Sequence, residues 1–322
     1  MGQESLKADG LRRPRPMRLA THRFGTHALI DLHSHILPGI DDGAPSIDVS
    51  VAMARAAVED GVSVVACTPH IMPGVWNNSG PEIRRAVDAL RSALAQHDVK
   101  LHLTTGADVH IAPNLVGAIK SGHVLTLHDS RYVLLELPHH IAPPRADTCF
   151  LQLLDAGYIP IFTHPERLSW IHKRYDLIEK LFEAGVWMQI TAGSFTGRFG
   201  ARAQQWSERM LRDGFVHILA SDMHNLTSRP ANLASGWVAA REIVGDDEAY
   251  RLVVARPYAI LRNDPPDAIA SPKTIASPAR SAGKRDGAPR PTAQTKVESE
   301  NSAEGLFSRM RGYFKGQLGR GR

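Results

Sequence analysis

The chain reads Ile30-Asp31-Leu32-His33-Ser34-His35-Ile36-Leu37-Pro38-Gly39-Ile40-Asp41-Asp42-Gly43 over fourteen residues, which contain two histidines and three carboxylates. Residues 28–32 are apolar apart from Asp31, and this pattern predicts a buried strand that leads into the histidines. His33 and His35 are two positions apart, so on an extended chain their side chains point to the same side and can hold one metal ion. A proline and two glycines then turn the chain and bring the following aspartates back toward the strand. A pair of surface histidines before an acidic turn is the alternative for this stretch alone.

The length of 322 residues suits one large α/β domain with tails, or two ordinary domains. Hydrophobic residues make up 43% of the chain, so a core can be buried. Cys67 and Cys149 are the only cysteines, and two thiols cannot build a disulfide framework, so we expect a reducing, cytoplasmic location. No apolar run is long enough to predict a transmembrane helix, and the N-terminus lacks the apolar centre of a signal peptide.

Charge is unevenly distributed along the chain. Residues 1–27 hold six Lys or Arg against two Asp or Glu, and residues 264–322 hold eleven against six. Residues 28–263 hold 21 basic and 25 acidic residues, so the pI of 9.3 reflects the two ends. The acidic central region is compatible with a cation site. It argues against a nucleic-acid substrate, because it shows no basic track lined with aromatic residues.

Strands and helices alternate between residues 28 and 263. We expect strands at 28–35, 62–67, 100–106, 131–137, 158–163, 186–191 and 216–221. We expect helices at about 46–60, 81–97, 145–156, 174–184, 199–213 and 231–244. Seven strand–helix repeats predict a parallel sheet closed as a TIM-like (β/α)7 barrel, with a doubly wound open sheet as the alternative.

The composition changes at both ends of this domain. We expect residues 1–27 to be a flexible basic leader and residues 264–304, rich in Pro, Ser, Ala and charge, to be a disordered linker. Residues 305–322 form a basic tail in which Leu306, Met310, Tyr313 and Phe314 follow helical spacing. This tail can dock on a membrane surface or on a partner as a short amphipathic helix, and a frayed end is the alternative.

Potential metal ligands recur at the C-terminal ends of the expected strands, where parallel barrels carry their active sites. A single histidine at a strand end is commonly structural, but six of the seven ends carry His, Asp or Glu, which predicts a metal site. Glu136 adds to this prediction, because an unpaired carboxylate in an apolar strand is costly to bury. The nine candidates are His33, His35, Asp42, His70, Asp108, Glu136, His164, Asp222 and His224.

Nine ligands are too many for one tetrahedral ion and enough for two or three ions that share carboxylates. His and carboxylate ligands without thiolate favour Mn, Fe or Zn over Ca. Such clusters generate hydroxide at neutral pH and bind phosphate oxygens. Arg167 and Arg229 follow two of the ligands, and each is either a phosphate-binding group or a solvated surface residue. Neither cysteine begins a Cys-x5-Arg loop, so a cysteinyl-phosphate mechanism is unsupported.

The succession of motifs resembles the PHP (polymerase and histidinol phosphatase) superfamily. Within it, the chain is most similar to the metal-dependent tyrosine phosphatases of capsule and exopolysaccharide loci, the CpsB/CapC-like group. The resemblance covers about residues 28–263. It rests on Asp31-Leu32-His33-Ser34-His35-Ile36-Leu37-Pro38-Gly39-Ile40-Asp41-Asp42-Gly43, Thr68-Pro69-His70, Leu135-Glu136-Leu137-Pro138, His164-Pro165-Glu166-Arg167 and Ser221-Asp222-Met223-His224-Asn225.

The resemblance implies a distorted PHP-type barrel with a trinuclear site, usually of Mn²⁺, with Fe, Zn, Mg or Co as alternatives. The resemblance implies one set of ligands for each ion. The first set is His33, His35, Glu136 and Asp222; the second is His70, Glu136 and His164; and the third is Asp42, Asp108 and His224. It also implies that Arg167 and Arg229 bind the phosphate while a metal-bound hydroxide attacks phosphotyrosine directly. The implied partner is a bacterial tyrosine kinase that regulates polysaccharide export, and the resemblance allows a homo-oligomer.

One candidate ligand departs from the family pattern. The Gly-x-Glu segment of the family reads Gly106-Ala107-Asp108 here, and the aspartate is one methylene shorter, so the third ion is expected to be held more weakly or to be shifted. Two other functions stay open from the sequence. They are a small-molecule phosphoesterase, such as a histidinol-phosphate phosphatase, and a non-catalytic scaffold of polysaccharide export.

Overall fold

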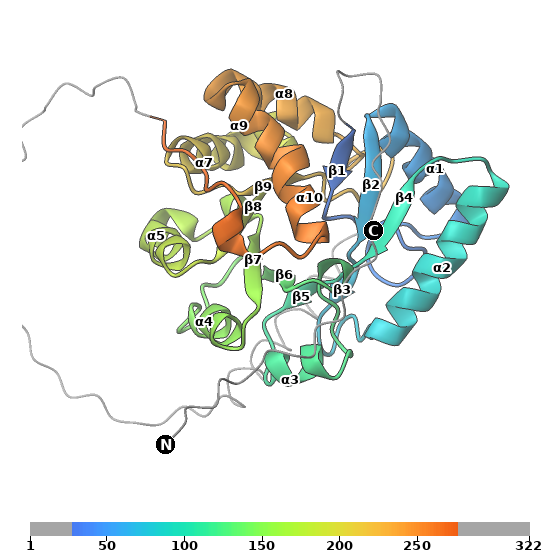
Figure 1. Cartoon of the computed structure of the whole chain (residues 1–322), viewed down its shortest axis with the longest axis horizontal. Coiled ribbons are helices and arrows are strands. Elements are labelled where there is room, and N and C mark those ends of the chain that lie inside the picture. The colour runs from blue at the N-terminus through green and yellow to red at the C-terminus, as the bar shows by residue number, and fades with distance from the viewer. Residues whose placement is uncertain (1–27, 276–322) are drawn as a thin grey trace, which may run out of the picture. The chain divides into compact units, whose positions relative to one another are not determined.

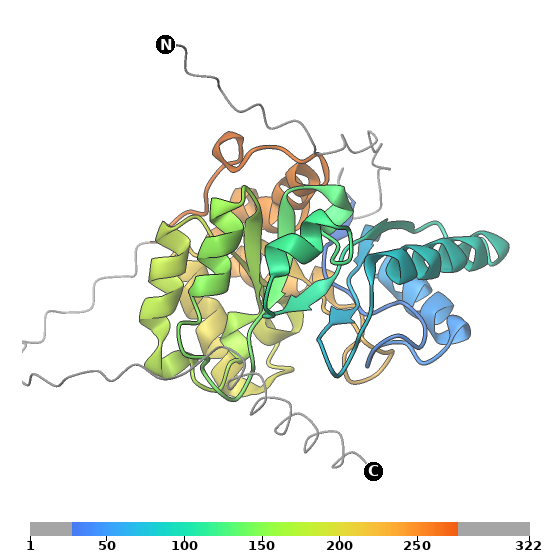
Figure 2. The ribbon, with the colours of Figure 1, turned by 90° about the horizontal axis from the view of Figure 1, so that it is seen from below.

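Parallel strands form the centre of the computed structural model, which describes residues 28–275, and helices surround them (Figures 1 and 2). The strands are β1 (Leu29–Asp31), β2 (Val62–Cys67), β3 (His70–Ile71), β4 (His102–Thr105), β5 (Asp108–His110), β6 (Tyr132–Glu136), β7 (Ile159–Thr163), β8 (Trp187–Thr191) and β9 (Ile218–Ala220). Each of the seven predicted strands is present. Two short strands are additions to the prediction, since β3 follows β2 and β5 follows β4.

The helices between the strands follow the predicted alternation, with additions. They are α1 (Ile47–Glu59), α2 (Gly80–Gln96), α3 (Leu115–Lys120), α4 (Thr148–Asp155), α5 (Tyr175–Glu183), α6 (Ala192–Phe195), α7 (Gly200–Arg212), α8 (Leu233–Val244), α9 (Asp246–Tyr250) and α10 (Arg256–Leu261). Figure 1 shows α1 and α2 beside β2 and β4, and α4 and α5 on the flank of β6 and β7. Among the described residues, no helix is long and apolar enough to cross a membrane.

The strands pair in two parallel sheets, and the hydrogen bonds described for residues 28–275 do not join them into one closed barrel. One sheet has the order β1-β2-β4, and the other has the order β3-β5-β6-β7-β8-β9. The division falls at Thr68-Pro69, where proline cannot donate a ladder hydrogen bond. A parallel bridge between Ser34 and Met223 nevertheless places the ends of β1 and β9 side by side. The parallel α/β fold is therefore confirmed, in a more divided form than expected.

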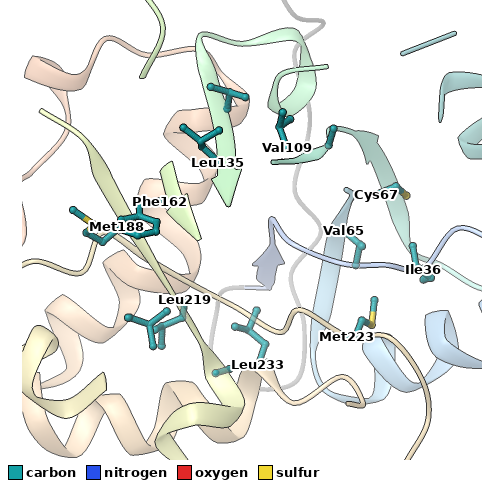
Figure 3. Close-up of a cluster of buried hydrophobic side chains, with 14 of the residues drawn as sticks. Ile36, Val65, Cys67, Val109, Leu135, Phe162, Met188, Leu219, Met223 and Leu233 are labelled. Carbon is teal, nitrogen blue, oxygen red and sulfur yellow. The ribbon is translucent and has the colours of Figure 1, made fainter. Parts of the chain in front are cut away.

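Alternate residues of the strands face two apolar clusters. Val133 and Leu135 belong to the larger cluster, which packs the strands against the helices (Figure 3). Tyr132 and Leu134 belong to the smaller cluster on the other side of the same strand. Glu136 follows the alternation of this second pair, so its carboxylate continues the inner row at the point where the strand ends.

The domain continues past the boundary expected at residue 263. The Ala270 carbonyl accepts a hydrogen bond of 2.8 Å from Arg256 Nε, and Ile275 N donates one of 2.8 Å to the Arg212 carbonyl. Residues 264–275 therefore pack on the domain, which differs from the expected disordered linker. The predicted leader at 1–27, the rest of the linker at 276–304 and the tail at 305–322 lie outside the described residues.

Candidate metal centre

The nine predicted ligands lie together at the C-terminal ends of the strands. Each belongs to at least one group of His and carboxylate atoms that are mutually within 4.8 Å. Eight of the nine are buried, and only Asp42 has an exposed side chain, with 44% of its surface accessible. The cluster therefore sits inside the domain and reaches solvent on the side of Asp42.

The first group surrounds the two histidines that follow β1. His33 Nε2 lies 3.2 Å from His35 Nε2, 3.4 Å from Asp222 Oδ1 and 3.6 Å from Asp108 Oδ2. His35 Nε2 lies 3.3 Å from the same Asp222 oxygen. Ligands bound at about 2.0–2.2 Å from one ion are separated by about 3–3.5 Å, so these four residues can share an ion.

The second group lies at the solvent side of the cluster. Asp42 Oδ1 is 3.4 Å from His224 Nε2 and 3.5 Å from His70 Nε2. The indole of Trp76 stacks on the His70 ring, with centroids 4.7 Å apart, and so limits the movement of that imidazole. These three ligands come from the loop after β1, from β3 and from the loop after β9, and they meet at the solvent side of the cluster.

The third group surrounds Glu136 at the end of β6. Its Oε2 atom lies 2.6 Å from His110 Nε2 and 3.5 Å from His70 Nδ1. Its Oε1 atom lies 2.9 Å from His139 Nε2 and 3.7 Å from His164 Nε2. One buried carboxylate therefore faces four imidazoles.

The partners of Asp108 and Glu136 differ from those that the resemblance implies. Asp108 lies beside His33 and His70 rather than with Asp42 and His224, and Glu136 is not grouped with the β1 histidines. Strand register explains both differences. Asp108 is level with His70 and is fully buried, whereas His110 is the residue level with Glu136. Asp108 is thus the more deeply buried of the two carboxylates.

Two side chains hold the β1 histidines in orientation. Asp41 Oδ2 accepts a hydrogen bond of 2.8 Å from His35 Nδ1, and Gln189 Oε1 lies 2.9 Å from His33 Nδ1. Both contacts leave the Nε2 atoms directed at the cluster, as ligand imidazoles require. Asp31 instead accepts a hydrogen bond of 3.0 Å from Ser221 N, so it supports the turn that carries Asp222.

Two ligands adopt a left-handed backbone conformation at the ends of their strands. The φ angle is 36° at His164 and 53° at Asp222. Such angles are unfavourable for residues other than glycine, and they persist where surrounding contacts impose them. Here His164 N donates to the Gln189 carbonyl and Asp222 N to the His33 carbonyl, both at 2.9 Å. The strain turns each side chain into the cluster.

Several buried ligand atoms have no hydrogen-bond partner. They include both oxygens of Asp108, Glu136 Oε2, Asp222 Oδ1, His164 Nδ1 and His224 Nε2. An unsatisfied buried polar atom costs about 1–3 kcal/mol, and more when it is charged. Bound cations would satisfy most of these atoms at once, so the donor set fits the metal ions that its composition predicts.

The two predicted arginines meet at Asp222. Arg167 Nη1 and Arg229 Nη2 both contact Asp222 Oδ2, the latter at 2.5 Å, while Oδ1 faces the histidines. Phe199 lies under the Arg167 guanidinium, 4.4 Å from its central carbon. Both arginines are thus part of the cluster and not solvated surface residues.

Charge interactions keep the carboxylates ionised. Burial alone would raise the pKa of Asp222, but Arg229, His33 and Arg167 hold it well below its usual value. Burial would also raise the pKa of Glu136, but the charge interaction with His110 lowers it well below its usual value. Burial and then Arg167 lower the pKa of His164, so its imidazole is neutral. Asp222, Glu136 and His164 are therefore in the protonation states that bind metals. The facing carboxylates outweigh burial and raise the pKa of His33, His35 and His110, so these imidazoles would release a proton when an ion binds.

Two histidines of the cluster were not among the nine candidates. His110 lies two residues after Asp108, the same spacing that drew attention to His33 and His35. His139 lies three residues after Glu136 and is 27% exposed. The first could have been found from the strand period. The second could not, because it lies in a loop whose course the sequence does not define.

Replacing Asp41 by asparagine is expected to weaken metal binding about 10- to 100-fold, because residues that orient a ligand histidine have effects of this size. Asp41 holds His35 Nδ1 and also accepts a hydrogen bond of 3.1 Å from His70 N. Titration of the purified variant with Mn²⁺ measures the change. The matched control is Asp48→Asn on the exposed face of α1, which should bind as the wild type does. Equal affinity of the two variants would contradict the role given to Asp41.

Known proteins resemble the chain over most of its length. The family model described as capsular polysaccharide synthesis, CpsB/CapC, matches residues 29–262. Tyrosine-protein phosphatase YwqE of Bacillus subtilis is 34% identical over 242 residues, which cover 74% of this chain and 95% of YwqE. Tyrosine-protein phosphatase CpsB of Streptococcus pneumoniae is 27% identical over 238 residues, which cover 72% of this chain and 98% of CpsB.

One solved structure is similar in fold as well as in sequence. It comes from crystallographic work on YwqE and on pneumococcal CpsB, which are described there as unique metal-dependent tyrosine phosphatases. The TM-score is 0.72 at 33% identity, and the match covers 77% of this chain and 100% of the solved one.

Proposed function

The chain belongs to the CpsB/CapC family, and from this premise we propose that it is a metal-dependent protein-tyrosine phosphatase. The observation that carries the proposal is the meeting of His and carboxylate groups with two arginines in one cluster. Metal ligands without the arginines would suit many hydrolases. The guanidinium pair adds the positive, bidentate donors that a phosphate dianion requires.

We infer that three ions, most simply Mn²⁺, occupy the cluster of a distorted PHP-type barrel. His33, His35, Asp108 and Asp222 would hold one ion, and Asp42, His70 and His224 would hold another. Glu136 and His164, with Asp108 between the groups, would hold the third. When bound, such ions activate water and stabilise the charge that develops on a phosphoryl group.

The side chains around the cluster have separate tasks in this reaction. Arg167 and Arg229 bind the oxygens of the phosphate that do not link it to tyrosine, and Phe199 keeps the Arg167 guanidinium in place. Asp222 anchors both arginines and faces the β1 histidines, so it links phosphate binding to the metal ligands. Burial of this network excludes bulk water and strengthens its electrostatic interactions.

We propose that the substrate is a phosphotyrosine-containing protein, and more narrowly the tyrosine-rich tail of a bacterial kinase that regulates capsule or exopolysaccharide synthesis. The family description, capsular polysaccharide synthesis, supports this assignment. An extended tail also suits a cluster that is buried except at its Asp42 side, because a flexible segment can carry a phosphotyrosine into it.

Purified full-length protein is expected to hydrolyse a phosphotyrosine peptide when Mn²⁺ is present and to lose at least about 100-fold in rate after chelation, because ions supply most of the charge stabilisation. Released phosphate measures the rate, and restoring Mn²⁺ should restore it. A phosphoserine peptide and histidinol phosphate are the comparison substrates. Turnover that survives chelation would contradict the mechanism, and faster turnover of histidinol phosphate would favour the small-molecule phosphoesterase.

A further inference from the structure

His110 is the closest neighbour of a buried carboxylate oxygen that lacks a hydrogen bond. Its Nε2 atom is 2.6 Å from Glu136 Oε2, yet the two are not aligned as donor and acceptor. The same nitrogen lies 3.3 Å from His70 Nδ1. His110 thus lies with His70, Asp108 and Glu136 in one group of potential ligand atoms, all within 4.8 Å of one another.

Strand geometry keeps His110 in this position. It shares β5 with Asp108, two residues away, so both side chains project to the same side. The register of β5 with β6 sets His110 level with Glu136. His110 is also buried, with 9% of its surface accessible, so its imidazole is held within the cluster.

The orientation of His70 leaves a ligand position open beside Glu136. His70 Nε2 faces Asp42, which in turn contacts His224, whereas its Nδ1 faces Asp108 and Glu136. An imidazole ordinarily gives one nitrogen to an ion and uses the other for a hydrogen bond. If His70 Nε2 binds the ion near Asp42, its Nδ1 donates to a carboxylate, and the ion at Glu136 needs another imidazole on this side.

We propose that His110 is a metal ligand and binds, through Nε2, the same ion as Glu136 and His164. The four residues His70, Asp108, His110 and Glu136 form a fully buried group of potential ligands. Two carboxylates in that group, Asp108 and Glu136, bring two negative charges that a cation would balance. The proposal rests on the proposed metal-dependent function and adds a tenth ligand to it.

Three variants distinguish a ligand from a residue that only donates a hydrogen bond to Glu136. His110→Gln keeps a donor but is a poor ligand. His110→Glu is a competent ligand but cannot donate to Glu136. His110→Ala removes both properties. The matched control is His97→Gln, at the exposed end of α2.

The measurements are the Mn²⁺ content of each purified protein at limiting metal, by elemental analysis, and the rise in melting temperature on Mn²⁺ addition. If His110 is a ligand, His110→Gln and His110→Ala should bind one ion at least about 10-fold more weakly, and His110→Glu should recover part of this affinity. His97→Gln should match the wild type.

Near-normal Mn²⁺ binding by His110→Gln would overturn the proposal and make His110 a hydrogen-bond donor. If His110→Glu does not fold, the comparison of Gln with Ala still decides, because equal losses support a ligand and full retention in Gln excludes one. Failure of the wild type to bind Mn²⁺ or to hydrolyse phosphotyrosine would instead refute the proposed function, so the two failures are distinguishable.

Discussion

Asp222→Asn is expected to lower kcat/KM for a phosphotyrosine peptide by about 1000-fold, at the upper end of the 100- to 1000-fold losses typical of a single stabilising group. The carboxylate faces His33 and His35 with one oxygen and accepts from Arg167 and Arg229 with the other. Asparagine keeps the shape of the side chain, but it removes the negative charge. It also directs an amide N–H either at the two histidines or at the two arginines. Steady-state kinetics in saturating Mn²⁺ measure the effect.

Two further observations make the result for Asp222 specific. Asp176→Asn, at an exposed position of α5 where the aspartate side chain is 71% accessible, is the control and should keep full activity. The Mn²⁺ content of Asp222→Asn should fall as well, because the residue is a proposed ligand. Activity within about 10-fold of the wild type would show that Asp222 does not link the arginines to the metal centre.

Glu248→Gln is expected to lower the free energy of unfolding by about 3–5 kcal/mol, because it leaves a buried guanidinium without its counter-charge. Arg256 is 1% exposed, and its Nη2 lies 2.6 Å from Glu248 Oε1. Arg256 also donates to the carbonyls of His217 and Ala270, so this pair ties α9, α10 and residues 264–275 to the start of β9. For a domain of this size the melting temperature should fall by roughly 6–20 °C.

A variant of Arg251, the second ion-pair partner of Glu248, provides the control. Arg251 lies 3.1 Å from Glu248 Oε2 and is 26% exposed, so Arg251→Ala should cost less than about 1 kcal/mol. The pair lies at the start of β9, whereas Asp222 follows its end, so the activity per folded molecule should be unchanged in both variants. A melting temperature of Glu248→Gln equal to that of Arg251→Ala would contradict the stabilising role of the pair.

The strands and most ligands could be predicted because each depends on local sequence. Apolar runs such as 62–67 and 131–137 define strands, and parallel strands place their C-terminal ends together. The partners of each ligand could not be predicted. They depend on register, which sets His110 rather than Asp108 level with Glu136. A shift of one residue changes which side chain faces which, and the sequence pattern alone does not measure it.

The sequence pattern also did not predict where the domain ends. After α8 the chain forms α9 and α10, which a π-helical segment at Arg251–Ala255 joins into one run, and Pro257 lies just after that segment. Arg256 likewise gave no sign of burial, because charged residues are rarely buried unless paired and the pair is formed only in three dimensions. Residues 264–275 show the same limit, since their polar composition predicts disorder while the hydrogen bonds hold them to the domain.

Residues that follow β1 and residues that follow β9 lie side by side in the candidate metal centre. Its assembly therefore depends on when the two ends of the domain meet. During synthesis His33 and His35 leave the ribosome almost two hundred residues before Asp222 and His224. Asp222 completes the group that contains His35, and His224 completes the group that contains Asp42. A chain that is still being synthesised therefore contains only part of each of these two ligand groups. We therefore expect full metal binding only after both ends of the domain have met.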